Sequence, residues 1–118
     1  MNYTSKVFRF DSVKADPVTM EGSSRVKVRW LITKEMGAKD FAMRVFEIES
    51  GGYSPLHKHP WEHEIFILEG IGLLIDDQKT TPFKAGDTVF VPPNQLHQFR
   101  NDGQTQLRFL CMIPYLKG

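Results

Sequence analysis

Residues 51–70, GGYSPLHKHPWEHEIFILEG, and residues 86–101, GDTVFVPPNQLHQFRN, together hold every histidine of this chain. The four are His57, His59, His63 and His97. Imidazole is the commonest side-chain ligand of divalent transition metals, and three imidazoles within seven residues followed by one on a distant segment form a ligand pattern. We therefore interpret the set as one metal site and not as scattered surface histidines.

The length and charge of the chain exclude several other functions. A chain of 118 residues is one domain, which we assign to residues 1–118. Its net charge of +1 gives no electrostatic reason to expect nucleic acid or an anionic membrane as a partner. Its longest apolar runs, such as residues 65–68, are far shorter than the ~20 residues of a membrane span.

The cellular compartment is predicted from two further features. The first residues contain no apolar signal region. The single cysteine, Cys111, cannot form an intramolecular disulfide, which agrees with a reducing environment. We expect a cytoplasmic protein.

The hydrophobic pattern predicts strands throughout. Residues 25–32 alternate, with Val26, Val28, Trp30 and Ile32 on one face and basic residues on the other. No segment shows a sustained helical period, and turn residues recur at short intervals, which favours an all-β sandwich or barrel. We expect strands at 7–10, 25–32, 41–49, 63–69, 73–78, 88–91, 96–100 and 106–113, with 80–87 a connection.

Both histidine segments resemble the two motifs of the cupins. Residues 51–70 fit G-x5-H-x-H-x3-E-x6-G with His63 in the glutamate position, and residues 86–101 fit G-x5-P-x-G-x2-H-x3-N except that Asn94 replaces a glycine. Asparagine is the non-glycine residue that best tolerates the left-handed backbone of such a turn. The domain then divides into N-terminal strands (1–50), motif one (51–70), motif two (86–101) and a C-terminal strand (105–113).

His63 and Glu64 compete for the fourth ligand position. The distance to Gly70 and the sequence parity with His57 and His59 favour His63. Glu64 fits the longer, four-residue spacing that the family also permits. If His63 is the ligand, Glu64 is either a carboxylate near the metal that moves a proton or an ordinary outward charge. Four neutral imidazoles would leave the full dipositive charge on the metal, so this choice sets the charge of the site.

The resemblance extends to small single-domain bacterial manganese cupins with an all-histidine site. It implies a jelly-roll barrel (a double-stranded β-helix), one divalent metal ion with manganese favoured over iron, nickel, copper or zinc, a small-molecule substrate and a homodimer. We expect a metal-dependent oxidoreductase, a dioxygenase acting on a small chelating oxygen-donor substrate. The alternative is a non-redox isomerase or lyase, or a binding module for a sugar-like molecule, because one fold hosts many chemistries.

Four further residues are expected around the metal pocket: Cys111, Phe99, Phe109 and Trp61. Cys111 shares a strand face with Phe109 opposite Arg108, so it is expected to point into the barrel. Each of the four has core packing as its alternative role. Arg44 and Arg100 could bind a substrate carboxylate only if they face inward.

Overall fold

The computed structural model describes residues 3–115, and within them it contains nine strands and two short 3-10 helices. The elements are η1 (Phe10–Ser12), β1 (Asp16–Pro17), β2 (Ser24–Ile32), η2 (Lys34–Met36), β3 (Phe41–Tyr53), β4 (His63–Glu69), β5 (Ile71–Asp76), β6 (Thr80–Lys84), β7 (Thr88–Val91), β8 (His97–Arg100) and β9 (Leu107–Pro114). In this part of the chain no helix is long and apolar enough to cross a membrane.

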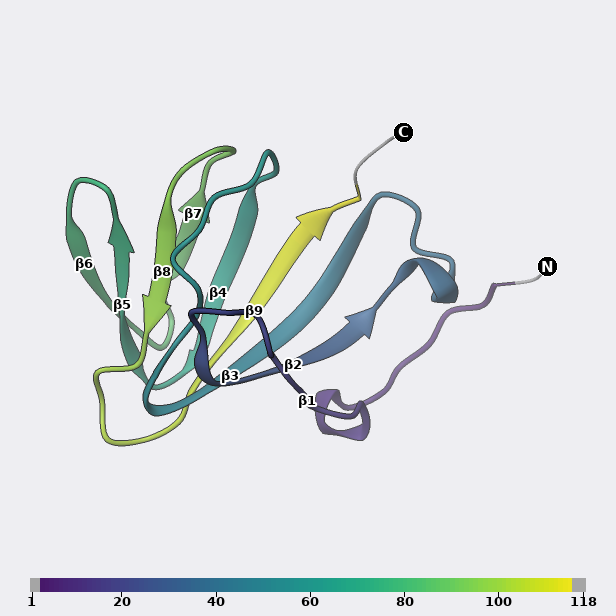
Figure 1. Cartoon of the computed structure of the whole chain (residues 1–118). Helices are drawn as coiled ribbons and strands as arrows, with labels where there is room; N and C mark the ends of the chain where they lie inside the picture. Colours follow the sequence, from purple (N-terminus) through teal and green to yellow (C-terminus); the bar gives the residue numbers. More distant parts are fainter. Residues whose placement is uncertain (1–2, 116–118) are drawn as a thin grey trace.

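One antiparallel sheet curls into a barrel (Figure 1). Its strand order is β6-β5-β8-β3-β9-β4-β7, and β2 pairs with the free side of β3 and carries β1. β3 is the long central strand, because it pairs with β2 and β9 along its length and with β8 at its end, where Tyr53 faces Arg100. The all-β prediction is confirmed.

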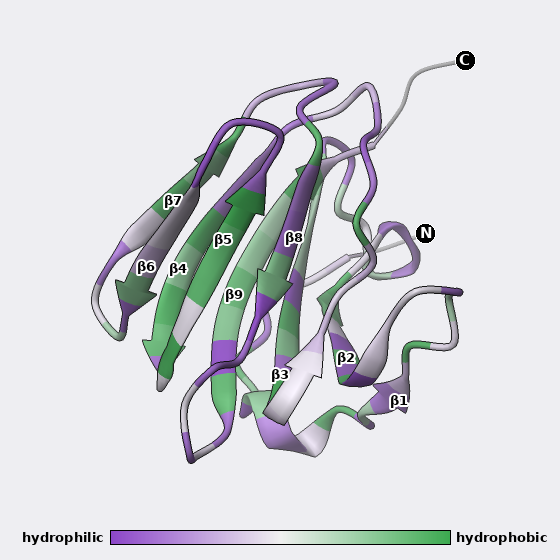
Figure 2. Cartoon of the chain, turned by 60° about the vertical axis from the view of Figure 1, so that its left-hand side comes forward, coloured by the Kyte–Doolittle hydropathy of each residue, from purple (hydrophilic) through white to green (hydrophobic). Residues whose placement is uncertain are grey.

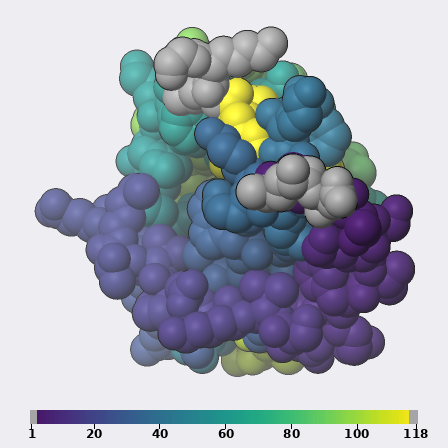
Figure 3. All heavy atoms as spheres, turned by 90° about the vertical axis from the view of Figure 1, so that its right-hand side faces the viewer, coloured from purple at the N-terminus to yellow at the C-terminus, as the bar shows by residue number. Residues whose placement is uncertain are grey.

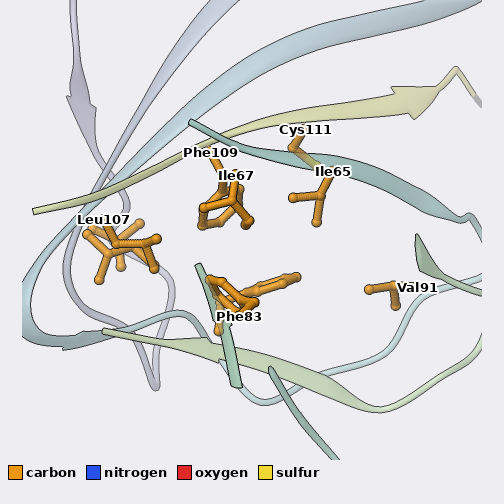
Figure 4. Close-up of a cluster of buried hydrophobic side chains, with 10 residues drawn as sticks. Ile65, Ile67, Phe83, Val91, Leu107, Phe109 and Cys111 are labelled. Atoms are coloured by element: carbon orange, nitrogen blue, oxygen red, sulfur yellow. The ribbon is translucent and has the colours of Figure 1, made fainter. Parts of the chain in front are cut away.

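The core follows from alternation along β3, β4 and β9. Phe46 faces Phe109 and Ile48 faces Leu107 across the β3–β9 ladder, so these side chains share the inner face. Figure 4 shows Leu107, Phe109 and Cys111 in sequence along β9, with Ile65 and Ile67 of β4 beside them and Phe83 opposite. In Figure 2, β4 and β9 carry the green of apolar residues along much of their length, as does β5. The Leu107 end of the barrel is therefore filled with hydrocarbon.

Three sequence predictions of local structure were wrong. Residues 7–10 form no strand, because Val7 is fully exposed without a neighbouring strand and η1 begins at Phe10. β3 continues through Gly51, whose φ of +81° suits glycine, and ends at Tyr53. The predicted connection at 80–87 contains β6, in which only Phe83 is buried, so one inward side chain left too weak a pattern to detect.

The N-terminal segment covers the outer face of β2, β3 and β9. There Glu47 is 4% exposed and accepts hydrogen bonds from Arg29 (3.4 Å) and Arg108 (2.9 Å). Both guanidinium groups also lie over the ring of Phe10. In Figure 3, residues of the first third of the chain, purple to blue, spread across this side of the molecule. The cover leaves the opposite, inner face of these strands to line the barrel.

Candidate metal centre

A short backbone bridge brings the two histidine segments together. The His57 N–H donates to the His97 carbonyl (3.1 Å), and the His97 N–H donates to the His57 carbonyl (2.9 Å). Beside this bridge, the N–H of Asn94 donates to the His59 carbonyl over 2.7 Å. Asn94 has φ of +65°, which confirms the left-handed turn expected from the sequence. Segments 40 residues apart in sequence are thus held in register by main-chain hydrogen bonds.

The imidazoles of the four histidines converge at the open end of the barrel. The ligand atoms of His57, His59 and His97 all lie within 4.8 Å of one another. His63, from the first position of β4, joins from one side, with its Nε2 2.7 Å from Nε2 of His59 and its ring centroid 5.1 Å from that of His97. The structure therefore brings together all four of the histidines that the sequence singles out.

The hydrogen bonds of the Nδ1 atoms decide which nitrogens are free. His59 Nδ1 donates to the Trp61 carbonyl (3.0 Å), and His97 Nδ1 donates to the Gln95 carbonyl (2.8 Å). A neutral imidazole that donates from Nδ1 keeps a lone pair on Nε2, which is the arrangement that metal ligands need. Trp61 also stacks on the His59 ring at 4.1 Å with an interplanar angle of 6°, which fixes its orientation.

His63 has a different partner. Its Nδ1 lies 3.0 Å from Sγ of Cys111 and 3.4 Å from Nη2 of Arg44, and Nη2 donates to the same sulfur over 3.1 Å. If His63 donates from Nδ1 to the sulfur, its Nε2 faces the other histidines with a free lone pair. Cys111, 1% exposed, therefore occupies the place that a backbone carbonyl takes beside His59 and His97.

All four histidines have a lowered pKa. Burial is the largest cause in each case. The pKa of His57 falls to about 4, with His97, His59 and Arg44 adding repulsion. The pKa of His63 falls further, with Arg44 the second cause after burial. The rings are therefore neutral at physiological pH, the form that binds a metal.

Glu64 lies on the other side of β4. It alternates with His63, which is 7% exposed, and its own side chain is exposed on the outer face beside Phe90 and Met112 of the neighbouring strands. The structure does not bring Glu64 to the histidines. The period-two geometry of a strand puts adjacent residues on opposite faces, so one of His63 and Glu64 had to point outward.

A cavity of about 590 Å³ opens beside the histidines. Its lining includes the four pocket residues expected from the sequence, Trp61, Phe99, Phe109 and Cys111. Residues 18–20 also line the cavity, a contribution that sequence reasoning missed because they carry no recognisable signal. Of the two arginines considered, Arg44 lines the cavity at 9% exposure, whereas Arg100 is exposed and stacks on Tyr53.

Searches against known proteins identify close relatives. The family model described as "Cupin domain" matches residues 44–113. An oxalate-binding protein from Thermotoga maritima is 37% identical over 80% of this chain and 80% of its own length. A polyketide cyclase from Streptomyces resistomycificus superposes with a TM-score of 0.89, at 34% identity over 94% of this chain and 80% of that one. A predicted oxalate decarboxylase from Thermotoga maritima gives 0.83, at 34% identity over 94% and 100%.

Proposed function

Because this chain belongs to the cupin family, we propose that it binds one divalent transition metal ion through His57, His59, His63 and His97. The observation that carries the proposal is the convergence of the four rings, with the ligand atoms of three of them within 4.8 Å of one another. The Nδ1 hydrogen bonds of His59 and His97 support it, because they direct Nε2 toward the cluster. The donor set fits a borderline metal ion.

Manganese is the ion that we favour, with iron, nickel, copper and zinc as alternatives, since all of them accept imidazole. The preference comes from the resemblance to manganese cupins with four histidines. A six-coordinate ion would keep two positions free beside four protein ligands. Those positions would face the cavity, where a small molecule with two oxygen donors can reach them.

The reaction that we propose is a dioxygenase-type oxidation of a small chelating substrate such as an enediol or a β-dicarbonyl. A bound metal would supply the two coordination positions that the chelating substrate occupies and would polarise that substrate for reaction with dioxygen. The protein contributes a largely apolar wall that includes Phe46, Phe99 and Phe109, which keeps water from the reacting molecule. Glu64 faces away from the cavity, so we assign it no part in this reaction.

Oxygen uptake tests the proposed reaction. The manganese- and iron-loaded protein is incubated with a panel of enediols and diketones in an oxygen electrode cell, with His97→Ala as the matched control. We expect substrate-dependent uptake in the wild-type protein and none in the variant. Absence of uptake with every substrate in both metal forms would contradict an oxidoreductase.

A non-redox role is the second candidate. The Thermotoga maritima relative is named as an oxalate-binding protein, so a related protein is described by binding a small oxygen-donor anion. In this chain the same site would bind a small molecule, or act as an isomerase or lyase with the metal as Lewis acid. Calorimetric binding of such a ligand without any oxygen uptake would favour this candidate over the first.

We also propose a cytoplasmic homodimer. The outer face of β4 and β7 exposes Phe66, Leu68 and Phe90, the last of them to 61%. Apolar side chains clustered on one sheet face mark an association surface. Light scattering after gel filtration should give twice the 13.6 kDa chain mass, and Phe90→Glu should reduce it to one chain mass. A wild-type protein that elutes as a monomer contradicts the dimer.

A further inference from the structure

Arg44 is a buried cation inside the barrel. It stands on β3 opposite Cys111 of β9 and Trp30 of β2, on the same inner face as Phe46 and Phe109. Only 9% of its surface is exposed, and it lines the same cavity as the four histidines. Its planar group lies over the rings of Trp30 and Phe46, with centroid distances of 5.2 and 4.7 Å. These contacts hold the guanidinium in one place.

No carboxylate neutralises this cation within the part of the chain that the structure describes. Each ion pair recorded there uses another basic residue, and the buried carboxylate of Glu47 binds Arg29 and Arg108 on the outer face. Arg44 donates a hydrogen bond to the sulfur of Cys111, and among the described residues the only other polar side-chain atom recorded near its Nη2 is Nδ1 of His63, 3.4 Å away; both groups are uncharged in their ordinary forms. A buried charge without a counter-ion is costly, so the arrangement is suited to a bound anion.

The composition of the cavity lining points to the same kind of ligand. Among the described residues, three buried side-chain polar atoms have no hydrogen-bond partner, and two of them, Nε of Arg44 and Nε1 of Trp61, belong to residues that line the cavity. Both atoms are donors. The described lining contains no aspartate or glutamate, so the cavity offers positive charge and N–H groups but no fixed negative charge. A ligand that carries negative charge and accepts hydrogen bonds fits a lining of this composition.

From this geometry we infer that Arg44 is the anion-binding residue of the cavity and that the ligand is a small organic acid whose carboxylate binds the guanidinium. A planar guanidinium matches a carboxylate with two parallel N–H donors, which an ammonium group cannot do. The inference deepens the proposed metal function, because it makes the chelating substrate a carboxylic acid, but Arg44 holds its place without the metal.

Calorimetry with malonate as the probe tests the inference. The protein is made metal-free with a chelator, dialysed into carboxylate-free buffer and titrated with malonate or with the uncharged malonamide, and the titrations are repeated on manganese-loaded protein. The variants are Arg44→Met and Arg44→Lys. Arg100→Met is the matched control, because Arg100 is exposed and packs on Tyr53 outside the cavity.

We expect malonate to bind the wild-type protein and malonamide to bind far more weakly. Arg44→Met should weaken malonate binding by about 10- to 100-fold, the usual effect of losing a charge-assisted hydrogen-bond pair. Arg44→Lys should show a smaller loss and Arg100→Met none. Malonate should also raise the melting temperature of the wild-type protein but not that of Arg44→Met, which shows folding and binding in one measurement.

The result that overturns the inference is equal malonate affinity in wild type and Arg44→Met, or no malonate binding in either metal state. The two proposals fail separately. Arg44-dependent binding to the metal-free protein, together with no manganese uptake, removes the metal function and keeps the anion site. Manganese uptake, together with malonate binding that is unchanged in Arg44→Met, keeps the metal function and removes the anion site.

Discussion

Replacing Asn101 with alanine should destabilise the protein strongly while leaving the histidines in place. Asn101 is 2% exposed. Its Nδ2 donates to the carbonyls of Ile48 and Thr105, both over 2.8 Å, and its Oδ1 accepts from the N–H of Gly103 over 2.9 Å. The side chain thus ties β3 to the turn that leads from β8 to β9.

The magnitude follows from those three hydrogen bonds. At a net ~1 kcal/mol each, their loss should lower the free energy of unfolding by about 3 kcal/mol. For a domain of this size that corresponds to a fall of about 10 °C in melting temperature.

Urea unfolding followed by tryptophan fluorescence, with calorimetric melting beside it, measures the change. Asp102→Ala is the control, because Asp102 is the exposed neighbour of Asn101 and should shift stability little. A loss below about 1 kcal/mol in Asn101→Ala, or an equal loss in the control, would refute the assignment of these hydrogen bonds as a structural clamp.

Three further predictions concern the site. Cys111→Ala removes the sulfur that lies 3.0 Å from Nδ1 of His63, and it should weaken manganese affinity by about 10- to 100-fold in competition titrations. Cys111→Ser should recover part of that affinity. An unchanged affinity in Cys111→Ala would count against Cys111 as the residue that orients His63. Asn94→Gly should have a free energy of unfolding within about 0.5 kcal/mol of the wild-type value, whereas Asn94→Val should lower it by about 1–2 kcal/mol, because residue 94 has φ of +65°. Equal stabilities of the two variants in urea unfolding would contradict the reasoning. Metal-free protein should lose stability as pH falls from 6.5 toward 4. In that range His57 of the unfolded chain binds a proton, whereas His57 of the folded chain, with its pKa of about 4, stays neutral. A His57→Gln variant whose urea midpoint falls as steeply with pH would contradict this prediction.

The fold and most of the site could be predicted from the sequence because the residue spacings within the two motifs, 51–70 and 86–101, are fixed by backbone geometry. Motif two requires a left-handed turn between Pro92 and His97, and Asn94 adopts it, so the spacing reports on backbone geometry as well as on ligands. Period-two alternation predicted one inner face for Val26, Val28, Trp30 and Ile32, and in the structure Val26 and Val28 are buried and Trp30 lines the cavity. The prediction for Ile32 was wrong, because the register with β3 shifts between Trp30 and Ile32 and Leu31 is buried instead. The same parity favoured His63 over Glu64 but could not decide between them, because the loop before β4 can change the phase of the pattern.

The anion-binding side of the cavity was beyond the sequence. Arg44 and Arg100 are each one basic residue in a strand, and nothing local distinguishes an inward arginine from an outward one. Arg44 faces inward because β3 pairs Arg44 with Cys111 and Phe46 with Phe109, a register set by strands more than 60 residues apart. The loss of the predicted strand at 7–10 has a similar origin, since a strand needs a partner that only the tertiary structure supplies.

Metal content measured by mass spectrometry on tag-free protein tests the central claim most directly. We predict about one divalent ion per chain in the wild type and in Glu64→Gln, and loss of that ion in each of the His57, His59, His63 and His97 alanine variants. Retention in the His63 variant would reduce the centre to three histidines. A wild-type protein that takes up no manganese, iron, nickel, copper or zinc would contradict the account.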